Sequence, residues 1–219
     1  MPDRIPIDGD HPDPSLLEKA TRIMQEGGVI AYPTETFYGL GADPLNESAL
    51  RRLYLIKGRT FSKPIPLIIG QRSDAERYVR TISDEGRRLM DHFWPGPLTI
   101  LFPAASLLPG VLTANTGKIG IRLSPNPIPA ELARRLGGAI TATSANISNE
   151  KECSTAGDVI RSLGVLVDAV VDGGASPGGR GSTIVDITVA PAVILREGVI
   201  SAARIGEVVP LGTTATRGN

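Results

Sequence analysis

The chain lacks several features that would each point to a particular class of protein. It has 219 residues, with one cysteine, two histidines and 4% aromatic residues. A single cysteine, Cys153, excludes an intramolecular disulfide framework and is typical of a reducing compartment. No segment approaches the roughly 18 consecutive apolar residues that a membrane-spanning helix requires, and the N-terminus has no apolar core of signal-peptide length. We therefore expect a cytoplasmic protein that makes no membrane contact.

The charge balance and the scarcity of histidine exclude further classes. The 23 basic residues equal the 23 acidic ones, so the whole molecule has no excess charge to attract nucleic acid, although a local basic patch is compatible with this balance. His11 and His92 are far apart in the sequence and lie near no acidic or cysteine ligand pattern. This arrangement argues against a histidine nucleophile or metal site, and we predict no metal-ligating residues.

Helical and strand patterns occupy most of the chain. Asn46 would cap the second predicted helix, and Pro95 would end the third. Apolar residues at helical spacing predict helices over residues 14–28, 46–59, 83–97, 129–138, 154–164 and 201–209. Short apolar segments predict strands over residues 29–33, 65–70, 98–104, 117–124, 138–144, 168–174, 182–188 and 192–198. On the first helix the pattern places Leu16, Ala20, Ile23 and Met24 on the buried face.

The order of these elements indicates the fold class. Strands outnumber helices and do not alternate strictly with them, which favours an α/β (α+β) fold in which helices pack on one twisted mixed β-sheet. No linker divides the chain. We expect a single domain over residues 15–209, an N-terminal extension over residues 1–14 and a flexible tail over residues 210–219.

Hydroxyl groups and cations gather at the ends of these elements. The predicted strand over residues 29–33 runs directly into Thr34 and Thr36. Lys57, Arg59 and Lys63 follow a helix within seven residues. Such charges often only complement the helix dipole, but a triphosphate, with roughly four negative charges, needs a cluster of this kind for neutralisation.

Further polar groups lie in the second half of the chain. Ser144 and Asn146 end a strand of small residues, and their spacing of two would point both side chains the same way. Ser182 follows a glycine-rich segment whose backbone N–H groups could receive an anion. Arg122 and Arg196 lie in apolar strand segments, where an arginine either faces solvent or pairs with an anion. Together these signals predict a site for anionic ligands built from many segments.

Six motifs follow one another along the chain: Pro33–Gly41, Lys57–Arg59, Pro95–Thr99, Ile121–Ser124, Thr143–Ser148 and Ser182–Gly198. Together they resemble those of the YrdC/Sua5 family, the threonylcarbamoyl-AMP synthases, over roughly residues 15–207. The resemblance implies a YrdC-like domain with a twisted sheet around a large concave cavity. We expect the short form of the family, because the sequence after the last motif is too short for the extra C-terminal domain of longer members.

The resemblance also implies a reaction and its residues. Such enzymes convert L-threonine, bicarbonate or CO2 and ATP, with Mg2+ accompanying ATP, into threonylcarbamoyl-AMP and pyrophosphate. The product serves the t6A modification of tRNA at adenosine 37, which other proteins of the pathway complete. Carried over by motif, the catalytic residues are Lys57, Arg59, Ser144 and Asn146, the ATP contacts are Arg59, Lys63, Lys118, Ser144 and Arg196, and the threonine contacts are Thr34, Arg122 and Ser182.

The chain departs from the family pattern at three positions, and two other functions stay open. Thr60 and Asn149 stand where proline and glycine are usual, and Ile68 matches a position where some members carry a histidine that touches threonine. One alternative is a related module that binds RNA or a nucleotide without this synthesis. The other is a carbamoyl-transfer domain of the hydrogenase-maturation type, which the single cysteine argues against.

Overall fold

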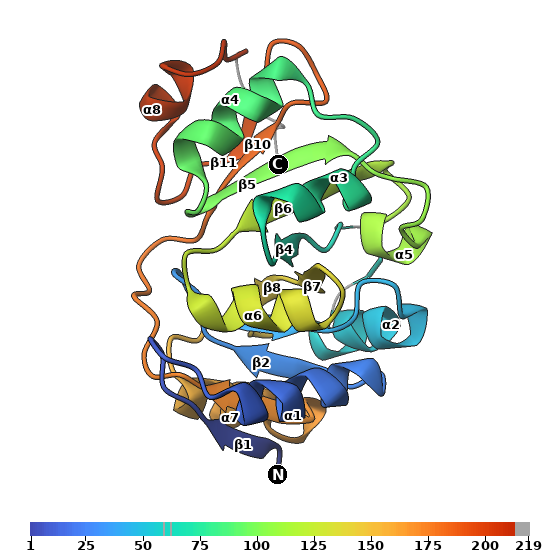
Figure 1. Cartoon of the computed structure of the whole chain (residues 1–219), viewed down its shortest axis with the longest axis vertical. Helices are drawn as coiled ribbons and strands as arrows, with labels where there is room; N and C mark the ends of the chain where they lie inside the picture. Colours follow the sequence, from blue (N-terminus) through green and yellow to red (C-terminus); the bar gives the residue numbers. More distant parts are fainter. Residues whose placement is uncertain (59, 62, 213–219) are drawn as a thin grey trace.

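The computed structural model describes residues 1–58, 60–61 and 63–212, and within these residues the strands form two mixed sheets. In Figure 1 the sheet with strand order β1-β9-β2-β3-β8 lies in the lower half, and the sheet with order β11-β10-β5-β6-β4-β7 lies above it. We call them the lower and the upper sheet. The predicted α/β class is confirmed, whereas the strands divide between two sheets and do not form the one sheet that we expected.

The lower sheet is parallel on one side and antiparallel on the other. Its central strand β2 pairs in parallel with β9, which pairs in parallel with β1, and β2 pairs antiparallel with β3. Part of the predicted N-terminal extension therefore forms the edge strand β1. The strands are β1 (Asp3–Pro6), β9 (Ala169–Asp172), β2 (Ile30–Tyr32), β3 (Gly39–Gly41) and β8 (Thr143–Ser144).

The upper sheet separates a core face from a polar face. On β6, Ile119 and Ile121 are fully buried in the core, and the alternate residues Lys118, Gly120 and Arg122 line a cavity on the other face. The neighbouring strands β5 and β10 alternate in the same way. The strands are β4 (Leu67–Ile69), β5 (Leu98–Pro103), β6 (Lys118–Leu123), β7 (Ala139–Thr141), β10 (Thr183–Asp186) and β11 (Val193–Arg196).

One residue carries the chain from the upper sheet to the lower. The predicted strand over residues 138–144 is divided, because β7 ends at Thr141 in the upper sheet and β8 begins at Thr143 in the lower one. Ala142 lies between them and donates its backbone N–H to the carbonyl of Pro66. Thr141 is fully buried, and its hydroxyl accepts from the backbone of Ala42 and donates to the carbonyl of Leu40. Hydrogen bonds therefore fix the crossing to the segment before β4, through Ala142, and to β3 and the residue after it, through Thr141.

Helices pack against both sheets, and their ends follow the local sequence signals. Asn46 caps α2 by accepting from the backbone N–H of Ala49, and α4 ends two residues before Pro95, as predicted. On α1 Ala20 and Met24 are buried as expected, while Leu17 lies deeper than Leu16. The helices are α1 (Pro14–Gln25), α2 (Glu47–Ile56), α3 (Ala75–Tyr78), α4 (Asp84–Phe93), α5 (Gly110–Thr113), α6 (Pro127–Arg135), α7 (Ala156–Leu163) and α8 (Ala202–Gly206).

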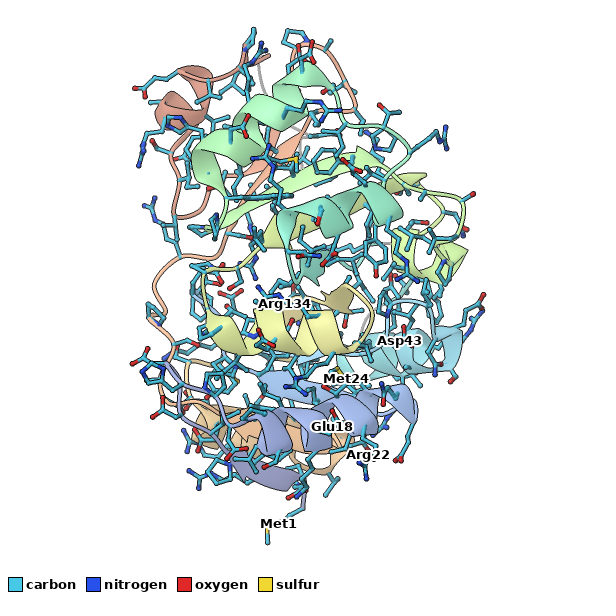
Figure 2. The ribbon with its side chains drawn as sticks, in the orientation of Figure 1. Met1, Glu18, Arg22, Met24, Asp43 and Arg134 are labelled. Carbon is cyan, nitrogen blue, oxygen red and sulfur yellow. The ribbon has the colours of Figure 1, made fainter. Side chains whose placement is uncertain are left out.

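Helices α1 and α6 lie side by side and cover the same region of the molecule. Figure 2 shows Glu18 and Arg22 on α1 and Arg134 on α6. Glu18 forms an ion pair with Arg135 of α6 at 3.3 Å between carboxylate and guanidinium, and Met24 packs inward with the core of the lower sheet. Among the described residues, no helix is both long enough and apolar enough to cross a membrane.

The two glycines of β3 make room for a buried tyrosine. Tyr32 is fully buried, and its hydroxyl donates to the carbonyl of Thr141 at 2.6 Å. A Cβ atom at Gly41 would lie 2.8 Å from Cε1 of Tyr32, and one at Gly39 would lie 3.2 Å from Cζ. These glycines therefore allow β3 to pass over the aromatic ring.

We expect Gly41→Ala to lower the free energy of unfolding by about 1–3 kcal/mol, because the new methyl group overlaps a ring that cannot move away. Chemical denaturation measures the change. Gly206→Ala is the matched control, since its Cβ would meet its nearest neighbour, Leu211, at 3.6 Å near the end of α8. The control should not destabilise the protein. Equal stabilities of the two variants would contradict the packing described for Tyr32.

Candidate active site

A cavity of about 1030 Å³ lies between the two sheets and collects nearly all of the predicted site residues. Its wall comes from the hairpin between β2 and β3, the polar face of the upper sheet and the segment after β8. Arg59 lies outside the described residues. The predicted residues that line the cavity are Thr34, Lys57, Lys63, Lys118, Arg122, Ser144, Asn146, Ser182 and Arg196.

Lys57 lies at the centre of the first polar cluster. Lys57 is 3% exposed. Its Nζ donates to the carbonyl of Ser144 at 2.8 Å, to Oγ of Ser144 at 3.2 Å and to Oδ1 of Asn146 at 2.7 Å. Ser144 Oγ also donates to Asn146 Oδ1 at 2.7 Å. The prediction that Ser144 and Asn146 point the same way is confirmed, and three neutral oxygens hold the ammonium group at the cavity wall.

Two turns bring this cluster together. Lys57 is the C-cap of α2, and the next residue, Gly58, has φ +58°, a conformation that favours glycine after a helix. Asn146 donates its backbone N–H to the carbonyl of Ser144, and Ser148 donates to the carbonyl of Lys57. Asn149 has φ +71°. Asparagine tolerates this left-handed conformation better than most residues, which explains why it can replace the usual glycine.

Arg122 and Glu35 form a buried ion pair. Arg122 Nη1 lies 2.6 Å from Glu35 Oε1, and the two side chains are 8% and 12% exposed. The other carboxylate oxygen of Glu35 accepts a hydrogen bond from Ser124 Oγ. The expectation that Arg122 faces solvent or pairs with an anion is met by a carboxylate from the hairpin between β2 and β3.

The threonines of this hairpin form a chain of hydrogen bonds that begins at Arg122. Arg122 Nη1 donates to Thr36 Oγ1 at 3.5 Å, and Thr34 Oγ1 donates to the carbonyl of Phe37 at 2.6 Å. The two hydroxyls are 3.1 Å apart. Because a hydroxyl has one proton and that of Thr34 is committed to Phe37, Thr36 is the donor between them. Thr34 therefore stabilises the turn, and Thr36 is the hydroxyl that contacts Arg122.

A second arginine packs against the glycine-rich segment. Arg196 Nη2 donates to the carbonyl of Ser182 at 2.8 Å and to its Oγ at 3.2 Å. Ser182 Oγ lies 2.9 Å from Thr99 Oγ1 on β5. Arg196 is thus held by neutral oxygens on the cavity rim. Burial lowers the pKa of its guanidinium, and the negative charge of Glu152 opposes this only in part.

Lys118 is engaged by a carboxylate. Its Nζ lies 2.7 Å from Oδ2 of Asp186, whose side chain is 8% exposed. Burial raises the pKa of Asp186, but hydrogen bonds from Lys118 and Thr188 outweigh this and leave the pKa below its ordinary value of 3.8. Lys118 therefore lines the cavity with its charge largely offset.

The lowered pKa of Asp186 predicts a pH-dependent contribution to stability. Ionised Asp186 stabilises the folded state above pH 3.8, and this stabilisation is lost as the pH falls through the folded-state pKa. We expect Asp186→Asn to be less stable than the wild type at pH 7, with the difference shrinking below pH 3.8. Urea titrations at pH 7 and pH 3 measure it. A difference that does not change with pH would contradict this ion pair.

The sequence motifs also singled out Lys63, as an ATP contact, and Ile68, as a departure from the family pattern. Lys63 is exposed and lines the cavity next to Pro64. Ile68 is fully buried in the core with Ile140 and Tyr32, while its neighbour Leu67 lines the cavity. In the parallel pairing of β4 with β6, Ile68 is the partner of Arg122, so its side chain lies on the same face of the upper sheet as Arg122. It packs in the core there and offers no hydrogen-bonding group where a histidine could contact threonine.

Sequence reasoning missed the partners of the predicted cations. Arg122 is paired with Glu35, Ser182 contacts Thr99, and Lys118 is paired with Asp186. The requirement that a buried arginine be paired could have directed attention to Glu35, which lies between the two threonines already singled out. Alternation along the strands could have identified Thr99, but no local signal marks Asp186.

The cavity has few groups for a metal ion. Among the described residues, no three histidine, cysteine or carboxylate side chains gather closely enough to hold one. Glu150 and Glu152 line the cavity on the segment after Asn146. This fits Mg2+ arriving with a nucleotide, because Mg2+ is commonly bound by substrate phosphates and only one or two carboxylates.

The fold and the cavity define an α/β protein with one large cavity whose wall carries several cations and hydroxyl groups. The family model Sua5_yciO_yrdC, described as "Telomere recombination", matches residues 22–198. The chain belongs to this family.

Curated relatives carry a common name. The chain is 34% identical over 190 residues to "Threonylcarbamoyl-AMP synthase" of Pyrococcus abyssi, covering 87% of this chain and 56% of the relative. It is 41% identical over 164 residues to the protein of that name from Thiobacillus denitrificans, covering 75% of this chain and 87% of the relative. The chain thus spans little more than half of the Pyrococcus relative but most of the Thiobacillus one.

Solved structures share the fold. "P. abyssi Sua5 complexed with L-threonine" superposes with a TM-score of 0.90 at 31% identity, covering 95% of this chain and 62% of that one. E. coli YciO superposes with a TM-score of 0.85 at 28% identity, covering 92% and 98%. A nucleotide-bound HypF structure, at 18% identity and a TM-score of 0.73, shows the fold alone.

Proposed function

We propose that this chain is a threonylcarbamoyl-AMP synthase that joins L-threonine, bicarbonate or CO2 and ATP and releases pyrophosphate. The observation that carries the proposal is a single cavity holding the Arg122–Glu35 pair, the Lys57–Ser144–Asn146 cluster and the Arg196–Ser182 pair. Relatives of this name and a structure with L-threonine bound support it.

The reaction needs two anions to meet. The threonine amine loses a proton and forms a C–N bond to CO2, giving a carbamate. A carbamate oxygen then attacks the α-phosphorus of ATP, and the bond to the β-phosphate breaks as pyrophosphate leaves. Mg2+, held by the ATP phosphates, would offset charge on them. No covalent bond to the protein is required, so positioning and electrostatic stabilisation would provide the catalysis.

Each group of side chains has a task in this scheme. Arg122 would bind the threonine carboxylate through charge-assisted hydrogen bonds, with Ser182 and the hairpin of Thr34 beside it. Lys57 would stabilise charge that develops on the phosphates, held in place by Ser144 and Asn146. Arg196 and Lys63 would bind ATP, and Lys118 would contribute less because Asp186 offsets its charge. The product would supply tRNA t6A modification, completed by partner proteins.

The test is pyrophosphate release from ATP by the purified protein, with and without L-threonine and bicarbonate. We expect release that requires both, and less when serine replaces threonine. Mass spectrometry should detect threonylcarbamoyl-AMP in the same mixtures. Protein that binds ATP but releases no pyrophosphate under any of these conditions would contradict the proposal. RNA titration at two salt concentrations would then test the binding-module alternative.

A further inference from the structure

The Arg122–Glu35 pair has a feature that charge neutralisation alone does not explain. Arg122 lines the cavity, and Glu35 stands behind it. Within the described residues, the protein engages Arg122 through Nη1, which contacts Glu35 at 2.6 Å and Thr36 at 3.5 Å. Glu35 is in turn fixed by Ser124, which follows β6. One side of the guanidinium is therefore bound to the protein, and the arginine still borders the cavity.

We infer that Glu35 is a positioning residue that holds Arg122 by one nitrogen and so presents the remainder of the guanidinium to the carboxylate of the amino-acid substrate. This inference rests on the proposed function. A guanidinium is a rigid fork, so fixing one arm fixes the direction of the others. A bidentate pair with a carboxylate depends on that direction more than on charge alone.

The same arrangement separates the two kinds of anion in the cavity. Because Glu35 already offsets the charge of Arg122, the pair attracts a singly charged carboxylate through directional hydrogen bonds but gives little net attraction to a triphosphate. Arg196 donates to the neutral oxygens of Ser182 and forms no ion pair within the described residues, so more of its charge is left for phosphates. Glu35 therefore directs the carboxylate and the nucleotide to different arginines.

The test compares Glu35→Gln with the wild type in the synthase assay, with KM for threonine and for ATP measured separately. We expect KM for threonine to rise about tenfold or more, as is typical when a hydrogen bond to a charged group is lost, and KM for ATP to change less than about twofold. If Glu35 only reduced the positive charge, its removal would tighten threonine binding. A fall in KM for threonine, or no change, would overturn the inference.

Two further variants separate positioning from folding. Ser124→Ala keeps the ion pair but removes the hydroxyl that fixes Glu35, so KM for threonine should rise by a smaller factor. Asp186→Asn removes the carboxylate of the other ion pair in the cavity and should leave KM for threonine within about twofold of the wild-type value. If Ser124→Ala has no effect, or Asp186→Asn has the same effect as Glu35→Gln, the positioning role is excluded.

Failure of the proposed function would be recognised separately. If the wild type makes no threonylcarbamoyl-AMP, that function is wrong, and calorimetric titration of L-threonine into the wild type and Glu35→Gln still tests Glu35. Weaker binding by the variant would support the inference. Equal or tighter binding by the variant would overturn it, and so would the absence of binding by the wild type.

Discussion

Replacing Lys57 by methionine should lower the rate of threonine-dependent pyrophosphate release by about 100- to 1000-fold, the range found when one preorganised donor is removed from a charge-stabilising site. Methionine fills a similar volume, so the wall of the cavity is kept while the ammonium group is lost. Ser144 and Asn146 then lose the donor that fixes both of them. Steady-state rates at saturating ATP and threonine measure the change.

The control for Lys57 is Lys151→Met, which removes the same charge from an exposed residue lining the same cavity. Its rate should fall less than about threefold, because exposed charges are screened by solvent. Circular dichroism and thermal unfolding would check that both variants are folded. A rate for Lys57→Met within threefold of the wild type would show that the cluster around Lys57 does not take part in the reaction.

Replacing Arg122 by methionine should lower the free energy of unfolding by about 3 kcal/mol or more, because removing one partner leaves the other charge buried without compensation. Glu35 is the charge left behind, in a side chain that is 12% exposed. The variant should also lose measurable threonine binding. Denaturant titration gives the stability, and calorimetry gives the binding.

The double variant Arg122→Met with Glu35→Gln distinguishes the ion pair from simple loss of packing. With both charges removed, most of the lost stability should return, since a buried pair contributes far less than its broken half costs. Threonine binding should not return, because no cation remains for the carboxylate. Additive losses of stability in the double variant would show that the two side chains are not coupled.

The helix and strand patterns in the sequence predicted those site residues that lie at the ends of regular elements. Lys57, Ser144 and Asn146 lie at or just after the ends of predicted elements, and their positions indicated one site for anionic ligands built from several segments. Motif resemblance added Lys118, which no local pattern marks as functional, and it assigned ligands to Ser182 and Arg196. These residues do line one cavity, although their contacts with substrates are proposals.

The ion pairs and the division into two sheets could not be predicted from one sequence. Glu35 reaches Arg122 because the two sheets pack together, and Asp186 reaches Lys118 across the intervening strand β5. Many other carboxylates would satisfy the same charge rule. Residues 138–144 read as one continuous strand, because Ala142 has no turn-forming side chain. Its change of sheet depends on a hydrogen bond to Pro66, which lies far away along the chain.

Because the chain crosses between the sheets over one residue, Ala142, the geometry of the site depends on the number of residues at that point. Side chains alternate along a strand, so inserting a single residue there would turn Ser144 away from Lys57 without altering any side chain of the cluster. Deletion at this point should be equally damaging, whereas the exposed turn at Val189–Ala190, between β10 and β11, offers room for added residues. Split or circularly permuted forms of the protein should therefore be opened at that turn and kept continuous at Ala142.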